Sequence, residues 1–206
     1  IILFGSLAKQ NITQNSDIDI LIIHFGDREF EKRLAAETFN FMMETGAPIE
    51  YLAYGYFQVK NNPTYFVKYN LENGVVLYMK NQDELKKKEI EGYINLSNIF
   101  EESAKYCFNQ RFIRAAIDLG YNSIELKIKA LLLKRLNDLP GTHGGLVSKF
   151  GQYYVRTKKI SKEIGHKINE ALSLRNKARY DPQAKFTNED WELISSLNQE
   201  LSKYFK

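Results

Sequence analysis

The chain has 206 residues, a formal net charge of +4 and 44% hydrophobic residues, a composition typical of a globular protein with a buried core. Its single cysteine, Cys107, excludes an internal disulfide and any zinc site built from several cysteines. No apolar run is long enough to span a membrane and no signal peptide is visible, so we expect a cytoplasmic protein without a membrane partner. Because the chain begins inside a strand-like run, Ile1-Ile2-Leu3, we also expect that a short N-terminal segment is missing.

The first 80 residues alternate strand-like and helix-like segments. Short apolar runs predict strands over Ile1–Phe4, Asp17–His24, Pro48–Tyr54 and Gly74–Met79, with a brief helix through Lys9 after the first strand. Apolar recurrence at helical spacing predicts helices over Asp27–Glu44 and Pro63–Asn70. Asp27 can cap the start of the longer helix and Gly46 its end. This order predicts a small mixed α/β domain over residues 1–80.

From Asp83 onward the strand signals stop. Amphipathic helices are predicted at about 83–108, 110–137, 143–156, 161–180 and 188–204. The second of these helices has one stripe that we expect to face the core: Phe112, Ala116, Leu119, Ser123, Leu126, Ala130 and Leu133. The sequence therefore predicts an all-α up-and-down helical bundle over residues 81–206, and an α+β fold class for the whole chain.

The charge is divided unequally between the two parts. Residues 1–80 carry 7 Lys/Arg and 9 Asp/Glu, whereas residues 81–206 carry 22 and 16. A basic second part suits nucleic acid, a nucleotide or an acidic partner as a ligand. It equally suits a set of helices whose Lys and Glu faces are solvated, so both interpretations stay open.

The motif that carries chemistry lies at the ends of the first two predicted strands. Asp17 and Asp19 are two residues apart on a strand, so both carboxylates point to one face. Two such acids repel one another unless a cation lies between them, and Mg²⁺ prefers carboxylates together with substrate phosphates. Gly5 lets the backbone approach those phosphates, and Ser6 opens a helix whose N–H groups face an anion.

Glu50 is the one acid of the third predicted strand, between Ile49 and Tyr51. Burying an unpaired carboxylate in an apolar strand is expensive, so its presence needs a reason. A metal ion shared with Asp17 and Asp19 is one such reason. An edge strand that turns Glu50 toward water is the other.

The pattern Gly5-Ser6-Leu7-Ala8 followed by Ser16-Asp17-Ile18-Asp19 resembles the minimal nucleotidyltransferases of the DNA polymerase β superfamily. The resemblance implies that Gly5 and Ser6, with Lys9 and Ser16 beside them, bind the triphosphate. It implies that Asp17 and Asp19 bind Mg²⁺, and that Glu50 is the third carboxylate, which can activate the attacking hydroxyl. Family members often have Arg-Gly where Lys9-Gln10 stand here, and Asp as the third acid.

The second part resembles a HEPN domain, through Thr142-His143-Gly144-Gly145 and the run LRNKARYDP at Leu174–Pro182. HEPN ribonucleases have an Arg followed, after four to six residues, by a His. Here Arg175 is followed after four residues by Tyr180, and a phenol that titrates near ~10 is a poor acid or base at neutral pH. We therefore expect no ribonuclease activity, and we interpret His24, His143 and His166 as structural residues.

Together these resemblances predict a Mg²⁺-dependent enzyme that transfers a nucleotide, AMP from ATP or another nucleoside triphosphate, to a hydroxyl. The acceptor is either a protein tyrosine, as in paired toxin–antitoxin systems, or a small molecule, as in the kanamycin nucleotidyltransferases. Arg175 and Tyr180 are the candidate acceptor-side residues, and a homodimer is expected. The alternative is a regulatory nucleotide-binding module of toxin–antitoxin type whose HEPN half binds a partner protein or nucleic acid.

Overall fold

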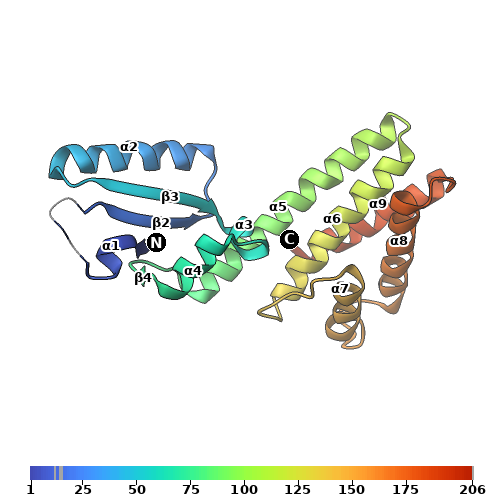
Figure 1. The fold of residues 1–206 in the computed structure, drawn as a ribbon. Coiled ribbons are helices and arrows are strands. Elements are labelled where there is room, and N and C mark those ends of the chain that lie inside the picture. The colour runs from blue at the N-terminus through green and yellow to red at the C-terminus, as the bar shows by residue number, and fades with distance from the viewer. Residues whose placement is uncertain (12, 14–15, 206) are drawn as a thin grey trace. The chain divides into compact units, whose positions relative to one another are not determined.

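The computed structural model describes residues 1–11, 13 and 16–205 (Figure 1). The chain folds into two compact units, Ile1–Asn81 and Gln82–Lys206, and each is described by itself. One unit contains a small mixed sheet with helices and the other is helical, which confirms the α+β fold class. None of the described helices is long and apolar enough to cross a membrane.

The sheet of the first unit has the strand order β3-β2-β1-β4. Its strands are β1 (Ile2–Phe4), β2 (Ile18–His24), β3 (Ile49–Gly55) and β4 (Val75–Val76). β2 and β3 are parallel, whereas β1 runs antiparallel to both β2 and β4. The connecting helices are α1 (Gly5–Ala8), α2 (Arg28–Thr45), α3 (Tyr56–Asn61) and α4 (Tyr65–Asn73).

The two faces of this sheet are covered by different helices. On one face the fully buried Leu21 of β2 packs with Ile2 of β1, Val59 of α3 and Val67 of α4. His24 points to the opposite face, because it is three residues further along β2, and its ring lies 4.8 Å from that of Phe30 in α2. Because successive side chains of β2 point to opposite faces of the sheet, Leu21 packs against α3 and α4 whereas His24 packs against α2.

The predicted ends of α2 are confirmed. The Asp27 side chain accepts hydrogen bonds from the backbone N–H groups of Glu29 and Phe30, which would otherwise lack partners at the start of the helix. Gly46 follows the last turn with φ +68°, the left-handed conformation that glycine adopts without a steric penalty. Asp27 and Gly46 thus fix the length of α2.

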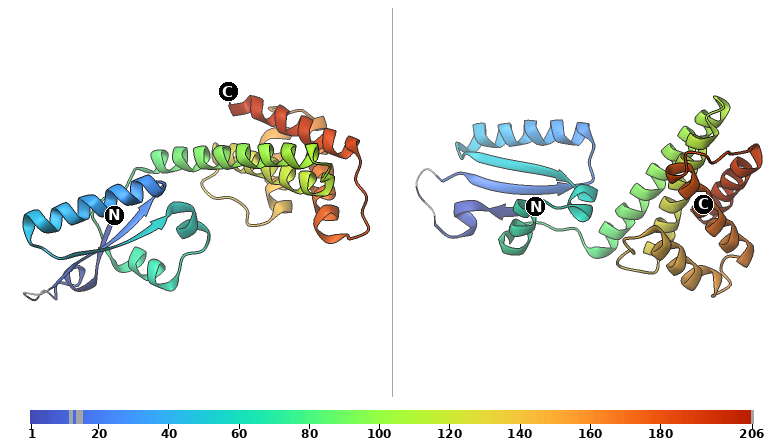
Figure 2. Two further views of the ribbon diagram at one scale, coloured as in Figure 1. Left: turned by 90° about the horizontal axis from the view of Figure 1, so that it is seen from above. Right: turned by 45° about the vertical axis from the view of Figure 1, so that its right-hand side comes forward.

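The second unit is a bundle built around one helix (Figure 2). Its helices are α5 (Gln82–Asn109), α6 (Ile113–Leu133), α7 (His143–Phe150), α8 (Lys162–Tyr180) and α9 (Asn188–Ser202), with a π-helix over Gly151–Val155 and a 3₁₀ turn over Lys203–Phe205. Most of α6 is buried, including Ile117, Tyr121 and Ile124, which lie off the predicted stripe. A helix that is apolar on most sides belongs in the centre of a bundle. The prediction that Phe112 faces the core was wrong. Phe112 precedes the first turn of α6, and its side chain is 65% exposed.

A buried ionic network joins three helices of the bundle. The Lys127 ammonium of α6, 1% exposed, donates to Glu101 Oε2 of α5 at 2.5 Å and to Asn198 Oδ1 of α9 at 3.0 Å. Burial lowers the pKa of Lys127, and Glu101 opposes that shift. Burial would raise the pKa of Glu101, but hydrogen bonds from Lys105 and Lys127 hold it below its usual value. The two charged groups therefore stabilise each other inside the bundle.

Three elements differ from the prediction. α3 was not predicted, because six residues are too few for helical recurrence to be visible. β4 is limited to Val75–Val76, and beyond it the N–H groups of Leu77 and Tyr78 both donate to the Ile1 carbonyl. The predicted helix over 143–156 changes from α to π geometry at Gly151.

Candidate functional site

The glycine of the first motif lies against the second aspartate. Gly5 has φ +71°, a conformation that side-chain-bearing residues rarely adopt, and it directly follows β1. A Cβ atom on Gly5 would overlap the Asp19 carboxylate and would lie 2.7 Å from its Cγ. Only glycine therefore lets the turn after β1 approach Asp19 this closely.

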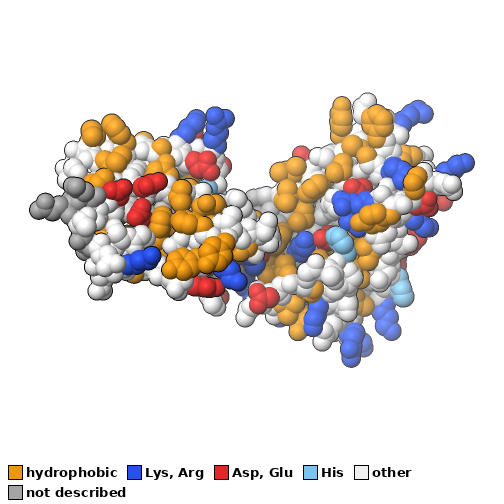
Figure 3. All heavy atoms as spheres, viewed as in Figure 1, with side chains coloured by type: hydrophobic (Ala, Val, Ile, Leu, Met, Phe, Trp, Pro, Cys, Tyr) orange, Lys and Arg blue, Asp and Glu red, His pale blue; other side chains and the backbone are white. Residues whose placement is uncertain are grey.

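The three candidate carboxylates lie at one end of the sheet. Phe4, the last residue of β1, pairs with Asp19, and Asp19 pairs in turn with Glu50 on the parallel strand β3. Because neighbouring strands lie about 4.8 Å apart, register partners on one sheet present their side chains side by side on one face. Asp17 stands one residue before β2, on the same face by alternation, and it is exposed. Glu50 is exposed too, because β3 is an edge strand, so Glu50 is not a buried acid that requires a metal ion. Figure 3 shows acidic side chains together at this end of the unit.

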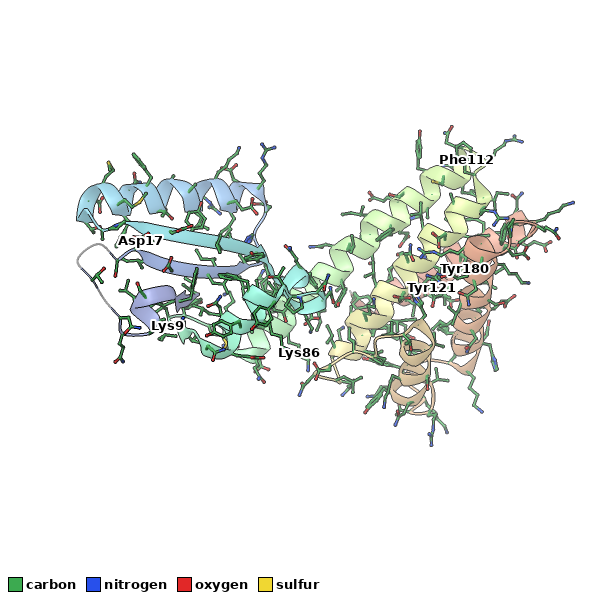
Figure 4. All side chains as sticks on the ribbon, viewed as in Figure 1. Lys9, Asp17, Lys86, Phe112, Tyr121 and Tyr180 are labelled. Atoms are coloured by element: carbon green, nitrogen blue, oxygen red, sulfur yellow. The ribbon has the colours of Figure 1, made fainter. Side chains whose placement is uncertain are left out.

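The remaining predicted nucleotide-binding residues surround the same end. Ser6 lies in the single turn of α1, and its carbonyl accepts a hydrogen bond from the N–H of Asn11. Ser16 Oγ accepts from the N–H of Thr13 at 2.9 Å. Lys9 caps α1 and is exposed, and Figure 4 places it at the same end of the unit as Asp17.

The described residues contain no preassembled group of three or more His, Cys, Asp or Glu side chains that could hold a metal ion. Asp19 and Glu50 are paired through their backbones, and the exposed Asp17 lies beside them at the strand end. Mg²⁺ needs only one or two carboxylates when substrate phosphates complete its coordination. The donor set therefore fits a Mg²⁺ ion that enters together with a nucleotide.

The second unit contains a polar cluster that the sequence did not predict. His143, the first residue of α7, contacts the Glu125 carboxylate of α6 through Nδ1. Its Nε2 lies 3.2 Å from Nη2 of Arg175 on α8. Because a guanidinium can only donate, Nε2 accepts that hydrogen bond, and the ring proton lies on Nδ1 facing Glu125. Glu125, His143 and Arg175, which we call the bundle triad, thus form one hydrogen-bonded row.

Arg175 is 3% exposed and incompletely satisfied. Its Nη1 donates to Asn176 Oδ1 at 3.0 Å, but its Nε has no hydrogen-bond acceptor among the described residues. The nearest acid to that Nε is Asp118, at 4.0 Å, and Asp118 already accepts from Arg179 Nε at 2.6 Å. A buried cation with a free donor is costly unless an anion approaches it.

Two tyrosines contact the bundle triad, Tyr121 on α6 and Tyr180 at the end of α8, and Figure 4 labels both. The Tyr121 hydroxyl is buried without a hydrogen-bond partner in the described part of the chain, and its ring centroid lies 6.4 Å from that of His143. Burial, and then the charge of Glu125, raise the pKa of Tyr121, so it stays protonated. Tyr180 is 73% exposed, and the Arg175 guanidinium carbon lies 5.8 Å from the centroid of its ring.

The loop after Tyr180 is held by one side chain. Arg114 of α6 donates to the carbonyls of Ala178 and Asp181 at 2.9 Å and of Ala184 at 2.8 Å. Its guanidinium carbon also lies 5.1 Å from the Phe186 ring centroid. Arg114 therefore closes the end of α8 and fixes the chain that follows Tyr180.

His143, which we interpreted as a structural residue, contacts Arg175 in the folded bundle. His143 lies 32 residues earlier, and only the packing of α7 against α8 brings it there. His143 is also at the helix start, as expected, since Thr142 caps α7 by accepting from the N–H of Gly145. Of the other two histidines, His24 is buried and His166 is exposed on α8.

Comparison with known proteins assigns both units. Residues 1–83 match the family model described as "Polymerase beta, Nucleotidyltransferase". Residues 90–205 match the model described as "HEPN domain". The chain is also 30% identical over 109 residues, 52% of its own length, to a protein of Methanocaldococcus jannaschii named "Putative toxin MJ0142", covering 73% of that protein. The chain therefore belongs to the HEPN family and carries a polymerase-beta nucleotidyltransferase domain in front of its HEPN domain, the fusion that the two sequence motifs predicted.

Proposed function

We propose that the chain transfers a nucleotide, AMP from ATP, to a hydroxyl group. The contact of Gly5 with Asp19, in register with Glu50, is the observation that carries this proposal. The turn after Gly5 would bind the triphosphate through its backbone, with Lys9 and Ser16 nearby. Asp17 and Asp19 would bind Mg²⁺, which when bound stabilises charge on the entering and leaving oxygens. Glu50 would accept the proton of the attacking hydroxyl as that oxygen attacks the α-phosphate and pyrophosphate leaves.

The acceptor is either a protein or a small molecule. Tyr180 supports a protein acceptor, because its phenol is exposed next to a cation that can hold a phosphate. The toxin named above supports a role of toxin–antitoxin type, and a homodimer would supply the acceptor from a second copy. Incubation with α-labelled ATP and Mg²⁺ separates the cases: label on the protein indicates self-modification, whereas pyrophosphate released only with an added alcohol indicates a small-molecule acceptor.

Tyr106 offers a matched control for the protein acceptor, since it is 67% exposed on α5 and outside the bundle triad. We expect Tyr180→Phe to abolish labelling of the chain and Tyr106→Phe to leave it intact. Equal labelling of both variants would exclude Tyr180 as the acceptor. Absence of both label and pyrophosphate in the unaltered protein would instead support a regulatory nucleotide-binding module.

The bundle triad supports a second function, cleavage of an RNA phosphodiester by the HEPN domain. The scissile phosphate would draw Arg175 toward itself and so uncover His143 Nε2, which then takes the proton of the ribose 2′-hydroxyl. The 2′-oxygen attacks phosphorus, the bond to the 5′-oxygen breaks, and that oxygen takes a proton from the imidazolium. Glu125 is a positioning residue that holds Nδ1.

RNA cleavage is tested in the Asp19→Asn background, where nucleotidyl transfer is expected to be lost. The products are a 2′,3′-cyclic phosphate and a 5′-hydroxyl end. We expect His143→Gln and Arg175→Gln to remove them, and Glu125→Gln to change the pH profile of the rate. Cleavage that survives His143→Gln, or none in the background protein, contradicts this second function and leaves the first untouched.

A further inference from the structure

A groove runs between α7 with its π-helix and the first half of α8. Its volume is about 630 Å³. Phe150 and Ile168, both buried, form its floor, and the polar side chains of Gln152, His166 and Asn169 lie along its rim. Gly151 also lines it, and a Cβ there would meet no atom within 4 Å. The groove therefore has an apolar floor and a rim of hydrogen-bonding groups.

The chain around this groove is basic and lacks acids. Residues 139–162 contain five Lys/Arg and no Asp or Glu. Arg156 and Lys162 line the groove, and Lys158 and Lys159 lie in the turn between the π-helix and α8. All four are exposed and make no ion pair within the part of the chain that the structure describes, and we call them the turn cations. Glu163, the next acid, is paired with Lys167 at 3.1 Å. In Figure 3 basic side chains gather at the end of the bundle formed by α7 and α8.

The backbone holds the turn cations in a fixed turn. The N–H groups of Lys159 and Ile160 both donate to the Tyr154 carbonyl, and that of Lys158 donates to Val155. Lys158 has φ +58°, the left-handed region that favours glycine. These hydrogen bonds and the conformation of Lys158 define the backbone of the turn.

We propose that this groove binds the phosphate backbone of a nucleic-acid strand. Unpaired Lys and Arg release counterions when they meet phosphates, and amide and imidazole groups on the rim can bond to phosphate or sugar oxygens. A membrane surface fits less well, because no large apolar side chain of residues 113–179 is exposed for insertion. The proposal deepens the RNA function proposed above by naming its binding surface, and it concerns binding alone.

The test measures binding of the full chain to a fluorescein-labelled 2′-O-methyl oligonucleotide, without ATP or Mg²⁺. Such a strand lacks the 2′-hydroxyl, so failure of cleavage or of nucleotidyl transfer cannot affect the result. For a single strand the slope of log K against log salt is about −0.7 per phosphate contacted. Replacing Arg156, Lys159 and Lys162 by Gln together should therefore reduce the slope by about 2 and weaken binding about tenfold or more at 0.1 M salt.

The control removes the same charge elsewhere, by replacing Lys32, Lys87 and Lys203 with Gln. These lysines are exposed on α2, α5 and the final 3₁₀ turn. We expect a change of about twofold at most, since only long-range attraction is lost. Equal weakening by the two triple variants would overturn the proposal, and so would an unchanged salt slope. Displacement of the strand by polyglutamate of equal charge would assign the groove to an acidic protein instead.

The substitution Lys158→Gly distinguishes a loss of affinity caused by the missing charge from one caused by a less stable fold. The substitution relieves the left-handed strain, so the melting temperature should not fall, while affinity should fall about two- to fivefold with a slope change of about 0.7. Weaker binding by a variant at least as stable as the parent supports a direct contact. Unchanged affinity in both Lys158→Gly and the triple variant would overturn the proposal.

Discussion

Replacing Gly5 by alanine tests the geometry of the nucleotidyltransferase site. The new Cβ would force a non-glycine residue to keep φ +71° and would overlap the Asp19 carboxylate. A left-handed conformation costs about 1–2 kcal/mol for a residue with a side chain, and overpacking costs about 1–3 kcal/mol. We therefore expect Gly5→Ala to lower the free energy of unfolding by about 2–5 kcal/mol, or to displace Asp19 and lose nucleotidyl transfer.

Gly46 provides the matched control for this substitution. It has nearly the same conformation, φ +68°, but a Cβ there would meet no atom within 4 Å. Gly46→Ala should therefore show only the conformational penalty of about 1–2 kcal/mol and keep full activity. Urea unfolding and transfer from α-labelled ATP measure both effects. Equal destabilisation by the two variants, with transfer retained in Gly5→Ala, would refute the close approach of Gly5 to Asp19.

Three further predictions concern the helical bundle. Lys127→Met leaves Glu101 Oε2 and Asn198 Oδ1 without their buried donor, although Lys105 still bonds Glu101 Oε1 at 2.7 Å, and should destabilise by about 1–3 kcal/mol in urea, whereas adding Glu101→Leu should restore part of that loss. Since Glu101 has a lowered pKa, its contribution to stability is fully present above the ordinary carboxyl pKa near ~4 and is lost as the pH falls from there through the lowered pKa of the folded protein. Glu101→Gln should flatten that acidic part of the stability profile, and an unchanged profile would contradict the assignment. Arg114→Met should free the loop at 181–186 and speed its proteolysis, an effect that Arg111→Met, at an exposed position, should not reproduce.

The residues of the first motif were predictable because their geometry is local. An aspartate pair at alternate positions of a strand shares a face whatever the rest of the fold does. The caps of α2 at Asp27 and Gly46 are likewise determined within one turn of the chain. The candidate site residues of the first unit lie at the ends of strands that apolar runs located along the chain, but the pairing of β2 with β3 that brings Asp19 beside Glu50 was not predicted.

The bundle triad could not be predicted in this way. His143 and Arg175 lie on different helices, and their contact depends on how α7 packs, which a helical pattern does not determine. The signal that could have found it was Glu125, a buried acid in the apolar α6 that needed a partner. For Phe112 the sequence pattern predicted too much. The apolar spacing extended the core-facing stripe to Phe112, but this residue precedes the first turn of α6 and is exposed.

The most direct test of the central claim is nucleotidyl transfer by Asp19→Asn. The variant keeps the shape of the side chain beside Gly5, so the circular dichroism spectrum and the unfolding midpoint should stay close to those of the parent. In α-labelled ATP with Mg²⁺ we expect release of pyrophosphate by the parent chain, with its acceptor present, and a loss of about 100-fold or more in the variant, because a metal carboxylate is replaced by a neutral amide. Undiminished transfer by a correctly folded Asp19→Asn variant would contradict the assignment of this strand end as the active site.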